Sequence, residues 1–334
     1  MSVPVEQKMT GGLLMIAPMM DWTDRHCRYF HRLLAPSAWL YTEMVTTGAL
    51  LHGDVPRHLA YDDSEHPLAL QLGGSDPEEL AKCCQLAAQW GYDEINLNVG
   101  CPSDRVQRGA FGACLMREPE LVRDCLAAMR AASAVPVSIK SRIGVDELDS
   151  WDFFENFYRT VAESGVQRVI VHARKAWLKG LSPKQNRQIP ELDYARVYRL
   201  KTEFPQFEVI VNGGITAVEQ IQPHLQTLDG VMIGRAAYQT PWLLTACERL
   251  LGNPDHFPDR DQILDQMIDY ASQQQAKGVP VRHIGRHLLG LYHGQPGGKQ
   301  WRRQMSECLQ DHNASPESWR RQRQQSGPMT AEVA

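Results

Sequence analysis

Short apolar segments recur along most of the chain, and each is followed by a turn and a segment of helical periodicity. Their apolar character is continuous rather than alternating, which is typical of parallel strands covered on both faces. The eight predicted strands are 13–17, 38–43, 68–72, 94–98, 137–140, 168–173, 208–212 and 230–234. The segments between them predict helices at 77–90, 118–131, 151–163, 191–203, 216–226 and 241–251.

Eight strand–helix units within about 240 residues are typical of a TIM (β/α)8 barrel. We therefore expect an α/β protein whose barrel spans residues 12–253. The alternative is an open, doubly wound sheet, which favours a glycine-rich turn after its first strand. The first strand here is followed instead by the proline-containing sequence APMMDWTD at 17–24, so the barrel is the better interpretation.

After Asn253 the strand pattern ends and only helical periodicity remains. Residues 253–261 (NPDHFPDRD) are predicted to be a linker. Helices are expected within 261–278, 281–294, 297–312 and 316–325, which together predict a small helical domain over 254–325. The polar ends, 1–11 and 326–334, are expected to be disordered.

The composition supports a soluble globular protein. The 334 residues are 43% hydrophobic and 22% charged, and no apolar stretch is long enough to span a membrane. The N-terminal sequence lacks the apolar core of a signal peptide, so we expect a cytoplasmic protein. The eight cysteines show no paired metal spacing, which argues against both a zinc site and a disulfide framework.

The net charge of −4 argues against indiscriminate nucleic-acid binding, but the charge is unevenly distributed. Residues 277–323 contain nine Lys or Arg and only three acidic residues. If the segment is extended back to Asp259, the excess of positive charge falls to +3. Solvated helix faces and a nucleic-acid contact are both consistent with this pattern.

Polar residues follow the predicted strands at the ends where a TIM barrel carries its active site. Each has an ordinary structural explanation alone, such as a turn or a strand entering solvent. Their convergence on one rim favours a shared site. The residues are Pro18, Met19, Gln71, Asn96, Asn98, Lys140, His172, Asn212, Gly213, Gly214, Gly234 and Arg235.

The last two strand ends predict a phosphate site. Asn212-Gly213-Gly214 and Gly234-Arg235 place small residues at helix starts, where backbone N–H groups can approach an anion beside an arginine. Lys140 and His172 could stabilise negative charge on a reduced flavin, and Gln71 could bond the edge of its ring. FMN fits this set better than NAD alone.

Cys101 lies in the sequence Asn98-Val99-Gly100-Cys101-Pro102, where glycine and proline predict a sharp turn that exposes the thiol. A buried structural cysteine is the alternative. A thiol stays mostly protonated at neutral pH and can donate a proton to carbon. A nucleophilic role would need a nearby base, and the local sequence offers none, so proton donation is the preferred hypothesis.

These motifs together resemble the tRNA-dihydrouridine synthases, flavoproteins that reduce specific uridines in tRNA. The resemblance covers nearly the whole chain. It is carried by APM (17–19), NLNVGCP (96–102) with Arg105, SIKSRIG (138–144), VHAR (171–174), NGG (212–214) and GR (234–235). The segments HARKAWLKGLSPKQNRQIP (172–190) and HLLGLYHGQPGGKQWRR (287–303) are similar to the A-type branch, which acts on D-loop uridines, here positions 20 and 20a.

The resemblance implies a cofactor, a reductant and a catalytic acid. FMN is reduced by NADPH and then passes a hydride from N5 to C6 of an extruded uracil, while Cys101 protonates C5. The residues that match the family's FMN-binding positions are Ala17, Pro18, Met19, Gln71, Lys140, His172, Asn212, Gly213, Gly214, Gly234 and Arg235.

The resemblance also implies contacts with tRNA and gives the basic C-terminal segment a partner. Asn98 is expected to contact the target nucleotide, and Lys184, Arg187, Arg302 and Arg303 match positions used against the tRNA backbone. Family precedent suggests a monomer. His283 and His287 have helical spacing suited to a metal, but a basic helix face explains them more simply, and we expect no metal.

Three other functions are compatible with parts of the pattern. A flavin-dependent barrel that reduces a free pyrimidine, similar to dihydroorotate dehydrogenase, would use the same cofactor loops without needing the basic helices. A non-catalytic RNA-binding barrel or a phosphosugar lyase would use the same anion site without redox chemistry.

Overall fold

The strands form a parallel barrel. The structure is a computed structural model that describes residues 12–103, 106–107, 109–311 and 314–326. Its strands are β1 (Leu13–Ile16), β2 (Leu40–Tyr41), β3 (Val45–Thr46), β4 (Leu68–Gly73), β5 (Glu94–Val99), β6 (Val137–Arg142), β7 (Arg168–His172), β8 (Glu208–Asn212) and β9 (Gly230–Ile233). They follow the order β1-β9-β8-β7-β6-β5-β4-β2, with β3 also paired to β4. Each of the eight predicted segments contains a strand.

A short bridge closes the barrel between its first strand and the segment that leads into β2. The N–H of Trp39 donates to the carbonyl of Leu14 (2.8 Å), and the N–H of Ile16 donates to the carbonyl of Trp39 (2.9 Å). The sheet therefore has no open edge at this point, and the predicted TIM barrel is confirmed.

The strand near residue 40 is shorter than predicted, and β3 was not predicted at all. The interruption lies at Thr42, whose side-chain Oγ1 accepts the backbone N–H of Gln71 (3.0 Å) in place of a backbone carbonyl. Pairing resumes only at Val45, which aligns with Leu72. One predicted strand therefore becomes two short ones.

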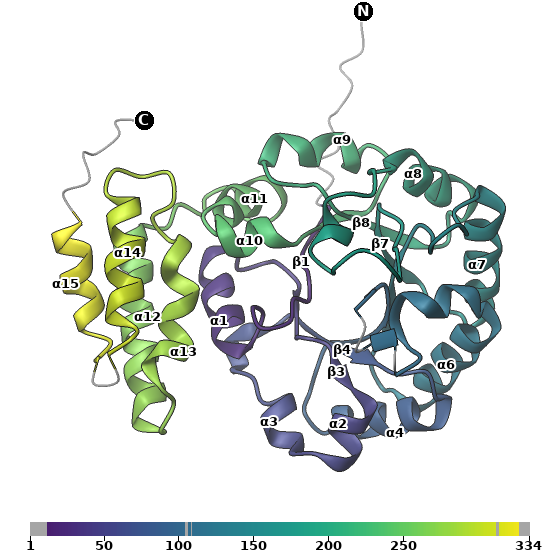
Figure 1. The fold of residues 1–334 in the computed structure, drawn as a ribbon, viewed down its shortest axis with the longest axis horizontal. Helices are drawn as coiled ribbons and strands as arrows, with labels where there is room; N and C mark the ends of the chain where they lie inside the picture. Colours follow the sequence, from purple (N-terminus) through teal and green to yellow (C-terminus); the bar gives the residue numbers. More distant parts are fainter. Residues whose placement is uncertain (1–11, 104–105, 108, 312–313, 327–334) are drawn as a thin grey trace, which may run out of the picture.

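Helices surround the barrel (Figure 1). Those that follow the barrel strands are α1 (Arg25–Leu34), α2 (Thr47–His52), α3 (Val55–Leu59), α4 (Pro77–Ala88), α6 (Pro119–Ala132), α7 (Trp151–Glu163), α8 (Tyr194–Glu203), α9 (Ile221–Leu225), α10 (Arg235–Gln239) and α11 (Leu243–Leu251). Short 3-10 turns lie at Asp63–Glu65, Gly112–Arg117, Gln185–Arg187, Val218–Gln220 and Arg286–Gly290. All six helices predicted between the strands are present.

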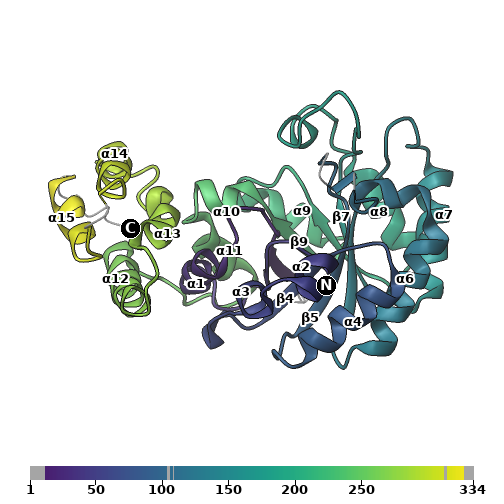
Figure 2. The same ribbon diagram turned by 60° about the horizontal axis from the view of Figure 1, so that its bottom comes forward.

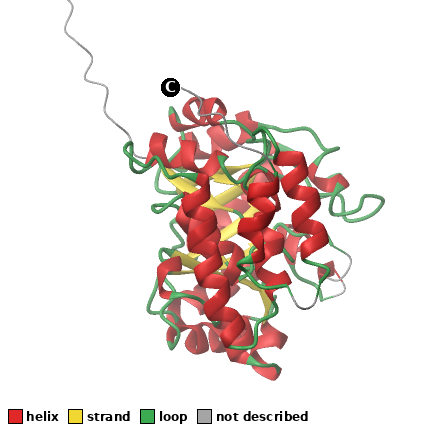
Figure 3. Ribbon diagram, turned by 90° about the vertical axis from the view of Figure 1, so that its left-hand side faces the viewer, coloured by secondary structure: helices red, strands yellow, loops and turns green. Residues whose placement is uncertain are grey.

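The C-terminal helices α12 (Arg260–Ala276), α13 (Val281–Gly285), α14 (Gly298–Cys308) and α15 (Ser318–Gln325) lie together on one side of the barrel, next to α1 (Figures 1 and 2). Figure 3 shows them in front of the strands. Trp301 and Trp319 are fully buried among them. The four predicted helical segments are confirmed, while the domain boundaries stay a prediction.

The predicted disordered ends lie almost wholly outside the described residues. The exception is Ser326, which is buried and whose hydroxyl bonds the carbonyl of Gln322 (2.7 Å), so the expected disorder is wrong at that residue. Within the described residues, no helix combines the length and apolar character that crossing a bilayer requires.

Candidate active site at the barrel mouth

The strand register brings the predicted cofactor residues to one end of the barrel. Asn98 aligns with Lys140, and His172 aligns with both Arg142 and Asn212. Ala17 directly follows β1 and precedes Pro18 and Met19, while Gly234 and Arg235 follow β9. Because the strands are parallel, these carboxyl ends form a single rim.

Buried amides connect the rim to the barrel interior. Gln71 and Asn96 are essentially inaccessible to solvent, and Gln71 Nε2 donates to Asn96 Oδ1 (2.8 Å). Asn98 Nδ2 in turn donates to Gln71 Oε1 (2.8 Å). Both polar atoms of the Gln71 side chain therefore have a partner within the protein, which fixes the orientation of its amide.

The chain turns sharply after β5, over residues 100–103, which we call the Cys101 loop. Asn98 Oδ1 accepts the N–H groups of Gly100 (3.1 Å) and Cys101 (3.0 Å). Arg142 Nε donates to the carbonyl of Gly100 (3.1 Å). All eight cysteines are unpaired, and Cys101 is partly exposed, as the sequence predicted. Arg105, in the same motif, lies outside the described residues.

Cations crowd the mouth of the barrel. Burial and the nearby Arg142 guanidinium lower the pKa of Lys140 to about 7. Burial, together with the neighbouring charges of Arg187 and Arg174, lowers the pKa of Arg142 to about 9. His172 is buried beside Arg142 and Lys140, and its pKa is lowered far enough to keep the imidazole neutral. The mouth is therefore suited to a group that brings negative charge.

The predicted phosphate cradle has the backbone and charges that an anion needs. Gly213 (φ 114°) and Gly214 (φ 77°) adopt conformations that favour glycine, and a Cβ at Gly214 would lie 2.4 Å from Tyr194 Oη. Burial and Arg235 together lower the pKa of Arg174. The Arg174 Nε is buried with no hydrogen-bond partner among the described residues. The Arg174 Nη1 donates to the carbonyl of Pro190, so Nε is the buried N–H that is left for a ligand, and its place beside a glycine turn fits the phosphate of FMN.

The predicted tRNA residues fall into two groups. Lys184 and Arg187 are exposed in the segment between β7 and α8, where the Arg187 carbonyl accepts a bond from Arg235 (3.0 Å). Arg302 and Arg303 are exposed on α14, so they lie in the helical unit rather than at the rim. Arg303 is 3.7 Å from Glu307, and Arg302 is 3.3 Å from His293.

Arg142 and Arg174 were not among the predicted site residues, although both lie inside the quoted motifs. Residues two apart on a strand share a face, so Lys140 in β6 indicates that Arg142 points the same way. The same spacing relates His172 to Arg174 and relates Glu94, Asn96 and Asn98 along β5. Strand periodicity was thus the signal that could have identified them.

The basic-face interpretation is wrong for His287. This side chain is buried and contacts Asp24 Oδ1 (3.0 Å) and Tyr238 Oη (3.2 Å). Asp24 also accepts a bond from Arg286 (2.6 Å), so α1 and the helical unit are joined at this point. Within the described part of the chain, no three His, Cys, Asp or Glu side chains cluster as metal ligands would.

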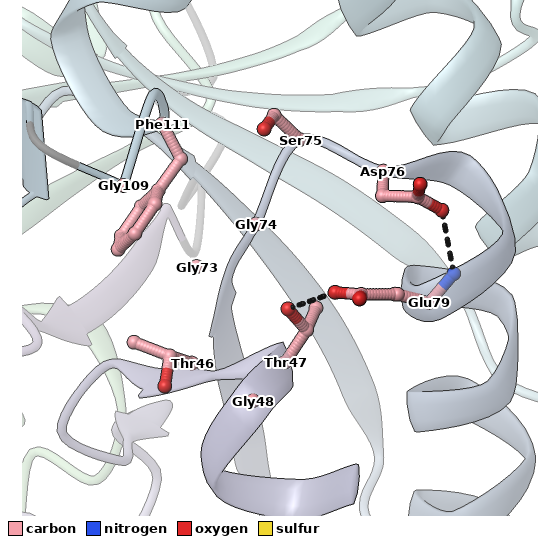
Figure 4. Close-up of a pocket in the computed structure, with 10 residues that line it drawn as sticks. All are labelled: Thr46, Thr47, Gly48, Gly73, Gly74, Ser75, Asp76, Glu79, Gly109 and Phe111. Atoms are coloured by element: carbon pink, nitrogen blue, oxygen red, sulfur yellow. Dashed lines mark hydrogen bonds between the residues drawn. The ribbon is translucent and has the colours of Figure 1, made fainter.

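A pocket of about 290 Å³ adjoins the rim at the ends of β3 and β4 (Figure 4). Thr47 bonds Glu79 across it (2.7 Å), and Phe111, which follows the Cys101 loop, forms its opposite wall. The other lining residues are Thr46, Gly48, Gly73, Gly74, Ser75, Asp76 and Gly109. None of these belongs to the predicted cofactor set.

The sequence profile of the family described as Dihydrouridine synthase (Dus) matches residues 15–325. The chain belongs to this family. The family consists of flavin-dependent oxidoreductases, so the cation-rich mouth is that of a flavin enzyme.

Three similar proteins bear the name tRNA-dihydrouridine(20/20a) synthase. That of Vibrio parahaemolyticus is 57% identical over 88% of this chain and 90% of its own length. That of Xanthomonas campestris is 58% identical over 88% of both chains. That of Escherichia coli K12 is 55% identical over 89% of this chain and 86% of its own length.

Proposed function

We propose that this protein is an FMN-dependent tRNA-dihydrouridine synthase. It would use NADPH to reduce the C5–C6 double bond of D-loop uridines, at the positions 20 and 20a that the names of its relatives give. The observation that carries the proposal is that Cys101, on its anchored loop, lies at the same rim as the cations that would hold the flavin.

Different cofactor residues would bind different parts of FMN. Gly213, Gly214, Gly234 and Arg235 would hold the phosphate, while Ala17, Pro18 and Met19 would form a wall beside β1. Gln71, Lys140, His172 and Asn212 would face the ring system. Bound FMN would supply a hydride from N5 to C6 of uracil, and NADPH would restore the reduced flavin. Lys140 supplies positive charge where the reduced ring carries negative charge.

Cys101 would donate a proton to C5 of the uracil. Hydride addition at C6 leaves a negative charge that extends to C5, and the thiol proton neutralises it. The resulting thiolate recovers its proton from solvent, which the partial exposure of Cys101 allows. Asn98 holds the backbone of the Cys101 loop and would contact the target nucleotide.

The uridine must leave the stacked tRNA before either reagent can reach it. Lys184 and Arg187 near the rim, and Arg302 and Arg303 on α14, would neutralise tRNA phosphates on both sides of the entrance. We further propose that the enzyme acts as a monomer in the cytoplasm, which light scattering with and without tRNA and cell fractionation would test.

The experiment is a comparison of two cysteine variants. Purified protein should absorb as a flavoprotein and form dihydrouridine in unmodified tRNA with NADPH. Cys101→Ala should retain FMN and lose turnover. Cys114→Ala is the matched control, because Cys114 is also partly exposed and follows the same loop. Wild-type turnover by Cys101→Ala would refute its role as proton donor.

A reductase of free pyrimidines remains the alternative with the most similar chemistry. It would share the cofactor residues and act on free uridine or uracil without needing tRNA. Assaying the full chain on free uridine and on tRNA separates the two, because the proposed enzyme requires the docked tRNA to deliver the base.

A further inference from the structure

A buried carboxylate lies at the amino-terminal end of the barrel, far along the strands from the Cys101 loop. Glu94 Oε1 accepts bonds from the hydroxyls of Tyr41 (2.7 Å) and Ser138 (2.5 Å), and Arg168 Nη1 donates to its Oε2 (2.5 Å). The Glu94 and Ser138 side chains are completely buried. Burial raises the pKa of Glu94, but the Arg168 charge and the bonds from Ser138 and Tyr41 oppose that rise and favour the ionised carboxylate, which acts as an acceptor.

A continuous series of hydrogen bonds runs from this carboxylate to the mouth. Asn96 Nδ2 donates to Ser138 Oγ (2.7 Å), Gln71 Nε2 donates to Asn96 Oδ1 (2.8 Å), and Asn98 Nδ2 donates to Gln71 Oε1 (2.8 Å). Asn98 Oδ1 then accepts two N–H groups of the Cys101 loop. We call Glu94, Ser138, Asn96, Gln71 and Asn98 the polar relay.

The chemistry of its two ends fixes the direction of every bond in the polar relay. A carboxylate can only accept, so the Ser138 hydrogen points to Glu94 and the Ser138 oxygen must accept from Asn96. Each amide then presents its oxygen to the next one toward the mouth. At the other end, backbone N–H groups can only donate, so they require the Asn98 oxygen. Both ends thus demand the same orientation of all three amides.

Packing alone does not explain the polar relay. The interior of a TIM barrel is ordinarily filled by branched apolar side chains, and apolar residues of similar volume stabilise a core as well as a buried polar network does. A fully connected polar network instead selects one arrangement of donors and acceptors. Two of its members, Gln71 and Asn98, lie where flavin and uracil are proposed to bind.

We propose that Glu94, Ser138 and Asn96 are positioning residues, which fix the donor and acceptor faces that Gln71 presents to the flavin and Asn98 to the Cys101 loop. This inference rests on the proposed function. None of the three touches the mouth, because each acts through the next member of the polar relay.

The test compares two variants, each of which removes a hydroxyl that donates to Glu94. Ser138→Ala cuts the polar relay, whereas Tyr41→Phe removes the other hydroxyl donor of Glu94 and leaves the relay connected. Tyr41→Phe loses one hydrogen bond to Glu94, whereas Ser138→Ala loses two buried hydrogen bonds, so Ser138→Ala should lower the melting temperature more. The informative measurements are the dissociation constant of FMN for the FMN-free protein and the reduction potential of the bound flavin.

We expect Ser138→Ala to weaken FMN binding about five- to tenfold and to shift the flavin potential. Tyr41→Phe should stay within about twofold of wild type in affinity. Ser138→Thr, which keeps the hydroxyl, should have the FMN affinity and the flavin potential of wild type. If Ser138→Ala does not fold, Ser138→Cys replaces it, because a thiol is a poor hydrogen-bond partner.

Equal effects of Ser138→Ala and Tyr41→Phe on FMN affinity and potential, or no effect of either, would overturn the role of the polar relay. Failure of the proposed function looks different. In that case wild-type protein itself would bind no FMN or form no dihydrouridine in tRNA.

Discussion

At the residue scale, the site depends on cations that lie close together, and among the described residues no carboxylate offsets the charge of Lys140, Arg142 or Arg174. Arg142, Arg174 and Arg187 each have a pKa lowered by burial and by neighbouring positive charge. Such an arrangement is unfavourable in the protein alone and is relieved by an anionic ligand. The repulsion between these cations lowers the stability of the cofactor-free protein and raises its affinity for an anionic ligand.

Lys140 provides a test through the pH dependence of stability. Its pKa is about 7 in the FMN-free protein and near 10.4 in an unfolded chain. Between these values the unfolded state binds one more proton, so the free energy of unfolding should rise with pH by up to about 1.4 kcal/mol per unit. Below pH 7 this contribution is constant and at its lowest.

Urea unfolding of FMN-free protein from pH 7 to 8.5, below the pKa of about 9 of Arg142, measures this slope. Lys140→Met should lack the rise, whereas Lys175→Met, which removes a lysine paired with Asp149, should keep it. A slope that is identical in wild type and Lys140→Met would show that Lys140 keeps its proton throughout this range.

Arg174 provides a second residue-scale prediction. Its buried Nε lacks a partner among the described residues, next to the proposed phosphate cradle. Arg174→Gln should weaken FMN binding by at least about tenfold, since a charge-assisted bond to phosphate is lost. Riboflavin, which has no phosphate, should bind wild type and variant equally in fluorescence titrations. Equal losses for both ligands would place Arg174 elsewhere in the site.

At the element scale, the strands were predictable and some helices were not. Continuous apolar runs identify parallel strands because both faces of such strands are buried. Once the barrel is recognised, the residues that lie at the carboxyl ends of its strands can be predicted as well. Helix α1 escaped prediction because its buried face carries Arg28 and Arg32. Their charges are satisfied by Glu65 and by the carbonyls of Glu65 and Pro67, partners that only the folded chain brings near.

Asp24 links elements that are distant in sequence. It caps α1 through the N–H groups of His26 and Cys27 (3.0 Å each). Burial opposes its ionisation, but bonds from His287, the Cys27 N–H and Arg286 outweigh burial and hold its pKa well below the usual range. Asp24→Ala should cost about 3 kcal/mol in unfolding free energy, about 1 from the cap and the rest from unpaired cations.

Asp76→Ala is the matched control for Asp24, because Asp76 caps α4 through two N–H groups and should cost only about 1 kcal/mol. The extra contribution of Asp24 is complete above the ordinary aspartate pKa and is lost as pH falls below it. Urea unfolding should therefore show a smaller difference in unfolding free energy between the two variants at pH 3 than at pH 7. If the two variants have the same unfolding free energy at pH 7, the contact between α1 and the C-terminal helices contributes little to stability.

At the scale of the whole molecule, the acidic net charge and the basic C-terminal segment affect RNA binding in opposite ways. A chain with net charge −4 repels RNA in general, so productive binding depends on the few places where cations are exposed. Of the exposed cations, those proposed to contact tRNA lie both near the rim and on α14. Two separated contacts can orient a large RNA, whereas one contact cannot.

Arg302 and Arg303 test this two-contact arrangement. Replacing both with Gln should raise the KM for tRNA about tenfold and make binding less sensitive to salt, because fewer counterions are released. The FMN dissociation constant should not change, since both residues lie on α14 and away from the cofactor site. Arg123→Gln, on α6, is the control, because its guanidinium is held by Asp124 and Glu163. If the control changes the salt dependence as much as the α14 variant does, tRNA is held by general attraction rather than by the helical unit.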